Sequence, residues 1–141
     1  MMVTILYRLE GEPSTEGCPN PFDDVREGLW YTDAIKWGAM NGIVLGYGYG
    51  KFGPNDPVTK EQLAALIYRT EQAHGKIPPD APEDKVDFYD ADTISDWAKG
   101  SVTALNSQGI FKDIPGGGFN PKAPALRNEI ASMLHRYLLA L

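Results

Sequence analysis

The sequence predicts an all-α fold, a pseudo-threefold bundle of helix–loop–helix repeats, and two observations predict it. The first is an internal repeat, because the segment that begins at Phe22 returns from Phe88. The second is a spacing of apolar residues at i, i+3, i+4 and i+7 in three segments, the pattern of an amphipathic helix. Repeats of one supersecondary unit bury their cores against each other and often present a binding surface. The function is therefore expected in what recurs.

The two copies align at an offset of 67 residues, with one extra residue between Phe88 and Trp97. The opening segment MMVTILYR (1–8) aligns with 62–69 at an offset of 61, and is a third, partial copy. The identical positions of the two full copies are Trp30 and Trp97, Gly42 and Gly109, Ile43 and Ile110, Phe52 and Phe119, Pro54 and Pro121, and Arg69 and Arg136.

The copies are expected to form one domain, because three equivalent amphipathic helices bury their stripes against each other or against the flanking helices. The parts of this domain, 1–141, are the end of a truncated repeat (1–12), a first full repeat (22–74) and a second full repeat (88–141). Proline-rich linkers at 12–21 and 75–87 separate them.

The opening lacks the basic region and cleavage site of a signal peptide. We therefore expect a fragment of a gene product, or a misplaced start.

The elements of the first full repeat follow in order. A helix is expected over about 31–41, and Gly42 suits the left-handed residue past its end. The glycine-rich stretch 46–50 predicts a turn, because only glycine takes positive φ without strain. A second helix begins after Thr59, which forms a capping-box signature with Gln62.

The second full repeat gives the same elements. Ser95 or Asp96 can cap its first helix, which runs to about Gln108 and stops at Gly109. The stretch 115–118 is the corresponding glycine-rich turn. The apolar stripes of the three equivalent helices are Leu63, Leu66, Ile67 and Thr70; Ile130, Met133, Leu134 and Tyr137; and Met2, Ile5, Leu6 and Leu9.

Composition excludes several classes of function. The net charge of −6 repels a phosphate backbone, so a nucleic-acid partner is not expected. No apolar run approaches 18 residues, so no membrane insertion is expected. A single cysteine, Cys18, excludes an internal disulfide and a cysteine-based metal site. Neither a metal nor a cofactor is expected.

The ordered set of motifs resembles the S-layer homology (SLH) family. The resemblance is carried by Phe22 to Val25, Trp30, Gly42-Ile43, Gly46-Tyr47, Gly50 to Pro54, Val58 to Gln62 and Arg69, and by Phe88 to Asp90, Trp97, Gly109-Ile110, Gly118 to Pro121, Leu126 to Glu129 and Arg136. It implies a non-catalytic module, outside the cell in the cell wall or S-layer. Such modules hold surface proteins to an anionic, often pyruvylated secondary cell-wall polysaccharide.

The resemblance also implies a site at the start of the second helices. The family's T-R-A-E motif falls on 59–62 and 126–129 of this sequence, and its basic residue contacts the glycan. A helix N-terminus has unpaired N–H groups and the positive end of a dipole, so an anion binds there readily. Arg127 can hold a carboxylate with two hydrogen bonds, whereas Lys60 acts as a point charge. The expected glycan-binding residues are Lys60, Arg127, Thr59, Glu61, Asn128, Tyr47 and Tyr49, the tyrosines as stacking platforms.

Two departures from the family pattern weaken the motif. Tyr49 replaces the acidic residue of the glycine loop, and Leu126 replaces the capping threonine, which costs the second copy about 1 kcal/mol of helix capping. Met1 aligns with Gln62, so the partial copy has lost the motif, and at most two basic contacts remain.

Other recurring residues have structural interpretations. Asp23, Asp24 and Asp90 are expected as turn or capping residues rather than calcium ligands. Trp30 and Trp97 are expected to pack in the core, with an exposed indole lining a groove as the alternative.

Two other classes of function stay open. A protein–protein or self-assembly module is the main alternative, in which a second copy covers the apolar stripe of the truncated first repeat. An enzyme is the weakest, because no Ser/His/Asp or Cys/His set recurs.

Overall fold

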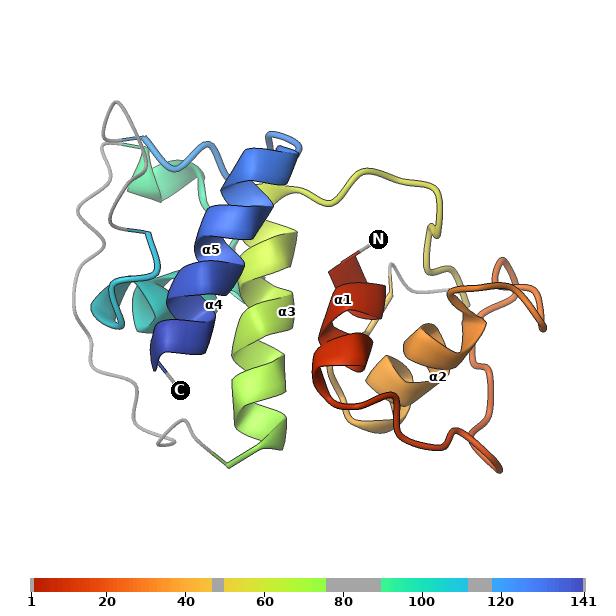
Figure 1. The fold of residues 1–141 in the computed structure, drawn as a ribbon. Coiled ribbons are helices and arrows are strands. Elements are labelled where there is room, and N and C mark those ends of the chain that lie inside the picture. Colours follow the sequence, from red (N-terminus) through yellow and green to blue (C-terminus); the bar gives the residue numbers. More distant parts are fainter. Residues whose placement is uncertain (1, 47–49, 76–89, 112–117, 141) are drawn as a thin grey trace. The chain divides into compact units, whose positions relative to one another are not determined.

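The structure is a computed structural model that describes residues 2–46, 50–75, 90–111 and 118–140 (Figure 1). These residues form helices and no β-strand, which confirms the predicted all-α fold. The helices are α1 (Met2–Leu9), α2 (Thr32–Met40), α3 (Lys60–Ala73), the short 3₁₀ helix η1 (Ala91–Thr93), α4 (Asp96–Ser107) and α5 (Arg127–Ala140).

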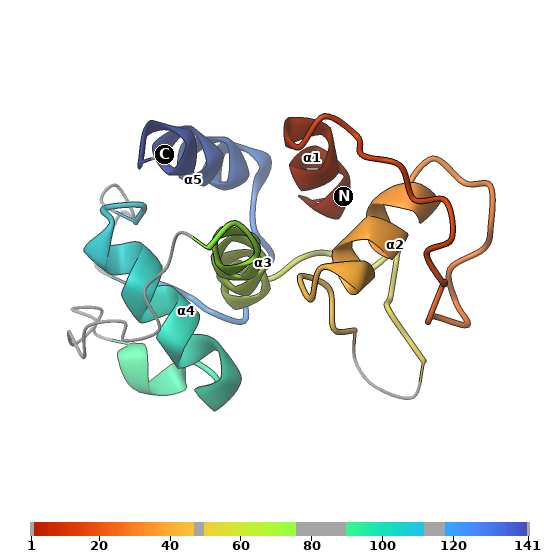
Figure 2. The same cartoon turned by 90° about the horizontal axis from the view of Figure 1, so that it is seen from below.

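The chain divides into two compact units, Met1–Asp56 and Pro57–Leu141. The boundary lies inside the first full repeat, since α3 belongs with the second repeat. The units therefore pair helices across repeats: α1 packs on α2, and α3 packs on α4 (Figure 2). The single domain and the threefold arrangement stay predictions.

The first unit is built on the packing of α1 against α2. The rings of Tyr7 and Trp37 meet with their centroids 5.6 Å apart. Gly38 permits close packing, because a Cβ there would lie 2.6 Å from Val44 and 3.4 Å from Val3. Met2 and Leu6 of the α1 stripe are buried, whereas Ile5 is half-buried and Leu9 is 47% exposed. Self-association itself stays a prediction.

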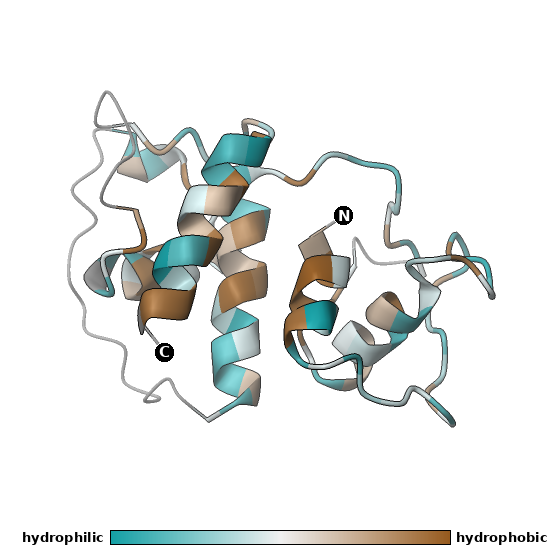
Figure 3. Cartoon of the chain, viewed as in Figure 1, coloured by the Kyte–Doolittle hydropathy of each residue, from teal (hydrophilic) through white to brown (hydrophobic). Residues whose placement is uncertain are grey.

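The second unit is built on α3 and α4. Leu63 and Ile67 of α3 are fully buried, as are Val102 and Leu105 of α4. The stripe of α5 is less completely covered, and hydrophobic and hydrophilic residues alternate along this helix (Figure 3). The predicted apolar stripes are thus confirmed in α3 and α5, the second helices of the two full repeats. The stripe of α3 is the more deeply buried.

The helix boundaries follow the predicted signals closely. Gly42 and Gly109 have φ values of 70° and 79°, as left-handed residues that end α2 and α4. The capping box is present: Gln62 N donates to Thr59 Oγ1 at 3.3 Å, and Thr59 N donates to Gln62 Oε1 at 3.0 Å. Ser95 precedes α4, but its hydroxyl does not cap that helix.

The loop predictions are only partly covered. Residues 47–49 of the first glycine loop, 115–117 of the second and 76–87 of the second linker lie outside the described residues.

An aspartate in each repeat fastens the segment that follows the glycine loop. Asp24 accepts hydrogen bonds from the backbone N–H groups of Phe52 (2.9 Å) and Gly53 (2.8 Å). Asp90 accepts the same two bonds in the second copy, from Phe119 N and Asn120 N, both at 2.8 Å. Burial raises the pKa of Asp24, but the backbone N–H groups and the charge of Lys51 together outweigh it and lower that pKa. The sequence predicted a local turn or capping role for Asp24 and Asp90, whereas these hydrogen bonds reach 28 to 30 residues along the chain.

Candidate functional site

The starts of α3 and α5 lie side by side in the second unit, so the two motif segments meet. Thr59 and Pro124 form an isolated antiparallel β-bridge. Lys60 N donates to Ala123 O at 3.0 Å, which pairs the first residue of α3 with the segment that leads into α5. The flanking bonds run from Glu61 N to Pro121 O (3.1 Å) and from Ala125 N to Val58 O (2.8 Å).

Lys60, an expected glycan contact, is buried and paired. Only 7% of the residue is exposed, and its Nζ lies 2.6 Å from Glu129 Oε2. The other oxygen of Glu129 accepts a hydrogen bond from Leu126 N at 2.9 Å, so half of a capping box survives without the threonine. Lys60 therefore connects α3 to the first turn of α5.

Glu61, another expected glycan contact, is the second residue of α3, and its carboxylate reaches Ser95 at the start of α4. It is 3% exposed, and its carboxylate accepts hydrogen bonds from Ser95 N (3.0 Å) and Ser95 Oγ (2.8 Å). Lys122 Nζ donates to the same carboxylate at 2.9 Å and also to Ser95 Oγ. Glu61 thus supplies the anion that a helix N-terminus favours, in place of an external ligand.

The pKa of Glu61 reflects this setting. Burial alone raises the pKa, but the hydrogen bonds from Ser95 and Lys122 outweigh burial and lower it below the ordinary value. Glu61 is therefore an ionised, buried group that ties α3, α4 and the segment before α5 together.

The first turn of α3 differs from the open N-terminus that the sequence suggested. The N–H groups of Lys60 and Glu61 donate to the segment before α5, and that of Gln62 donates to Thr59 Oγ1. The hydroxyl of Thr59 is thus used as a cap. The expected unpaired donors are absent here, because the following repeat packs against this end of the helix.

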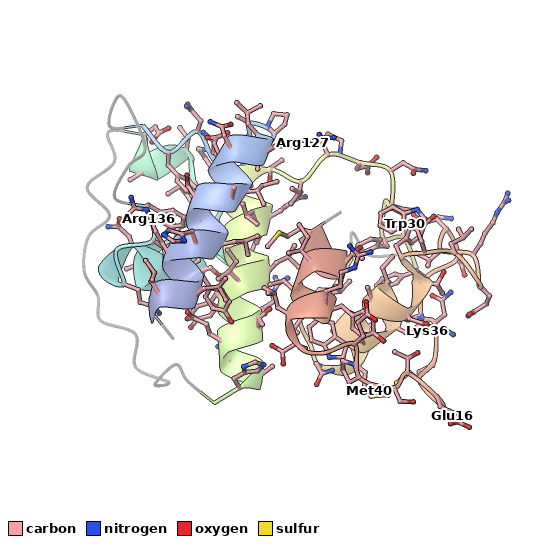
Figure 4. All side chains as sticks on the ribbon, in the orientation of Figure 1. Glu16, Trp30, Lys36, Met40, Arg127 and Arg136 are labelled. Atoms are coloured by element: carbon pink, nitrogen blue, oxygen red, sulfur yellow. The ribbon has the colours of Figure 1, made fainter. Side chains whose placement is uncertain are left out.

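The first turn of α5 is open. Arg127 and Asn128 are exposed, and Arg127 begins the helix (Figure 4). Within the described residues, no ion pair involves Arg127, and no acceptor is found for the backbone N–H groups of Arg127 and Asn128. The cations Lys60 and Lys122 each pair with a carboxylate, so among the described residues of this cluster Arg127 is the cation without a matching carboxylate.

The aromatic expectations have different outcomes. Trp30 is 67% exposed and Trp97 is 54% exposed, so the expected core packing of these indoles is wrong. Trp30 lies just before α2 and meets the ring of Tyr31 edge-on, with centroids 5.2 Å apart. The alternative, an exposed indole, fits both positions. Tyr47 and Tyr49 lie outside the described residues.

Two residues of the cluster were not predicted from the sequence. Lys122 and Ser95 have no part in the T-R-A-E motif. One signal was available: Glu61 stands at the alanine position of that motif, and Lys122 stands where the first copy has Asn55. Glu61 and Lys122 carry opposite charges beside the two equivalent motifs, and this pairing of charges favours an ion pair between them.

Comparison with known proteins identifies the family. A model described as "S-layer homology domain" matches residues 21–64 and 87–131. The chain belongs to the S-layer homology family. It is therefore a non-catalytic anchoring module of the cell surface.

Relatives with similar sequences include surface and wall proteins. The chain is 31% identical over 128 residues to the surface-layer 125 kDa protein of Lysinibacillus sphaericus, a match that covers 89% of this chain and 10% of that protein. It is 28% identical over 97 residues to the middle cell wall protein of Brevibacillus brevis, covering 69% of this chain and 9% of that protein.

An enzyme is also similar to the chain. Exoglucanase XynX of Acetivibrio thermocellus is 34% identical over 119 residues, which cover 83% of this chain and 11% of the enzyme. The chain thus spans about a tenth of the length of these three relatives. Among the described helices, none combines the length and hydropathy needed to cross a bilayer.

Proposed function

We propose that this S-layer homology module holds a surface protein to the cell wall by binding an anionic, pyruvylated secondary cell-wall polysaccharide. Arg127 is the charged contact of this interaction. Its guanidinium is exposed at the N-terminus of α5 and lacks an ion-pair partner among the described residues. This is the observation that carries the proposal.

The chemistry of this end of α5 suits a carboxylate. A guanidinium binds a carboxylate through two parallel hydrogen bonds. The N–H groups of Arg127 and Asn128 add donors at the positive end of the helix dipole. The chain's overall charge of −6 repels an anionic polymer, but physiological salt screens that repulsion beyond about 8 Å, so the local charge of Arg127 decides the contact.

The other expected contacts take a supporting role in this proposal. Lys60, Thr59 and Glu61 each have a partner inside the protein, so we expect that they do not touch the glycan. Lys60 supports the first turn of α5 through Glu129. Asn128 is exposed beside Arg127 and remains a proposed contact. Tyr47 and Tyr49 also remain proposed stacking residues, outside the described residues.

Co-sedimentation with purified cell-wall sacculi tests the proposal. The wild-type chain is expected to sediment with sacculi and to stay in solution once hydrofluoric acid has removed the polysaccharide. Arg127→Ala is expected to bind about tenfold more weakly, because truncation of a binding arginine costs more than about 1 kcal/mol. The matched control is Lys99→Ala, which removes another exposed cation of the same unit and is expected to bind normally. Binding that survives extraction would contradict the proposal.

A further inference from the structure

Asn41 follows the last residue of α2, and it is the only asparagine of the sequence that a glycine follows. Such an asparagine can react with its own backbone, because the side-chain carbonyl carbon is held close to the next backbone nitrogen. A following glycine makes the ring closure easier, since it has no Cβ to obstruct the approach. The pair Asn41-Gly42 is therefore a candidate for spontaneous loss of a side-chain amide.

The structure leaves this pair accessible. Both residues are exposed, and a Cβ added at Gly42 would meet no atom of the described residues within 4 Å. The N–H of Gly42 donates to Ala39 O at 3.3 Å, longer than the common value of about 2.9–3.0 Å. The side-chain amide of Asn41 donates to Trp37 O at 2.8 Å. That bond must open before the ring closes, so the reaction depends on fraying of the last helical turn.

The second repeat has the same helix end without the reactive pair. Gln108 follows α4 with φ −83° and ψ −1°, where Asn41 has φ −94° and ψ 8°. Gly109 comes next with φ 79°, where Gly42 has 70°. Ring closure from glutamine forms a larger ring and must fix one more rotatable bond, which costs conformational entropy. The two repeats therefore carry a reactive and an unreactive copy of one backbone geometry.

We propose that Asn41 is a site of spontaneous deamidation, and that its conversion loosens the first unit. The deprotonated backbone nitrogen of Gly42 attacks Cγ of Asn41, the bond from Cγ to Nδ2 breaks, and Nδ2 takes a proton from water and leaves as ammonia. Water then opens the cyclic imide at either carbonyl carbon, which gives aspartate or isoaspartate. The net reaction consumes one water and releases one ammonia, with no oxidant or reductant.

Both products weaken the end of α2. A carboxylate at position 41 loses the hydrogen bond to Trp37 O and places a negative charge at the negative end of the helix dipole. Isoaspartate also adds a carbon to the backbone just after this position. The N–H groups of Ile43 and Val44 donate to Gly38 O at 2.8 Å and 3.1 Å, and both side chains are buried. The longer backbone displaces these two residues, so the change reaches the core of the first unit.

Peptide mapping by mass spectrometry, after prolonged incubation of the full chain in mildly alkaline buffer, tests the proposal. Aspartate and isoaspartate are expected to form at position 41 at least about tenfold faster than glutamate at position 108, because of the additional bond to be fixed. The matched control is Asn41→Gln, which copies the helix end of the second repeat and is expected to keep its amide. Full retention of Asn41 in the folded chain, while the urea-unfolded chain loses it, would overturn the proposal.

The loosening of the first unit has its own readout in thermal unfolding. The incubated wild type is expected to show a second population with a lower midpoint, in proportion to the conversion at position 41. Asn41→Asp adds the charge without the additional backbone carbon, so its midpoint is expected between those of the fresh wild type and the isoaspartate form. Asn41→Gln is expected to keep its midpoint through the incubation. A converted chain that unfolds like the fresh wild type would overturn the claim that conversion loosens this unit.

Discussion

The first turns of α3 and α5 occupy equivalent positions in the two repeats, yet the structure uses them differently. Lys60 is buried against Glu129, whereas Arg127 is exposed at the start of its helix. The N–H groups at the start of α3 donate to the segment before α5, whereas those at the start of α5 have no acceptor within the described residues. A basic residue that recurs in a repeat therefore serves packing where a neighbouring segment covers it, and is exposed where the described residues leave it uncovered.

The largest expected effect contrasts Glu61 with its equivalent, Asn128. Glu61→Ala removes a buried carboxylate and leaves Ser95 N and Lys122 without their acceptor, so we expect a loss of about 3 kcal/mol in the free energy of unfolding. Asn128→Ala is expected to change stability by less than about 0.5 kcal/mol, because the side chain is exposed. Urea unfolding measures both, and equal losses would contradict the contrast.

A smaller effect concerns a position where the two repeats behave alike. Asp24→Ala and Asp90→Ala each remove an acceptor of two backbone N–H groups, and each is expected to cost about 2 kcal/mol. Thermal unfolding of the two variants tests this equality. If only one variant were destabilised, the aspartates would differ in role as Lys60 and Arg127 do.

The smallest effect is a dependence on pH at the start of α4. The lowered pKa of Glu61 contributes stability that is fully present above its ordinary value of about 4.5 and is lost as the pH falls through the folded-state pKa. Glu61→Gln is expected to flatten the acid limb of a plot of unfolding free energy against pH, while Lys99→Ala leaves its shape unchanged. An acid limb as steep in Glu61→Gln as in the wild type would exclude Glu61 as its source.

The local elements could be predicted from the sequence because their signals are local. Gly42, Gly109 and the Thr59–Gln62 capping box act within a few residues, and each was confirmed. The roles of Lys60 and Glu61 could not be predicted, because their partners Glu129, Ser95 and Lys122 lie 34 to 69 residues away. The expected burial of Trp30 and Trp97 was wrong. A large apolar side chain near a helix start predicts burial, but its exposure depends on which other segments pack against it.

The central claim is that Arg127 binds the polysaccharide and Lys60 joins the repeats. The most direct measurement is the affinity of Lys60→Met and Arg127→Met for soluble wall polysaccharide, by calorimetry at a temperature where both variants are folded. We expect Arg127→Met to bind about tenfold more weakly than the wild type and Lys60→Met to keep its affinity, although it unfolds about 2 kcal/mol more easily. Loss of affinity in Lys60→Met with full affinity in Arg127→Met would contradict the account.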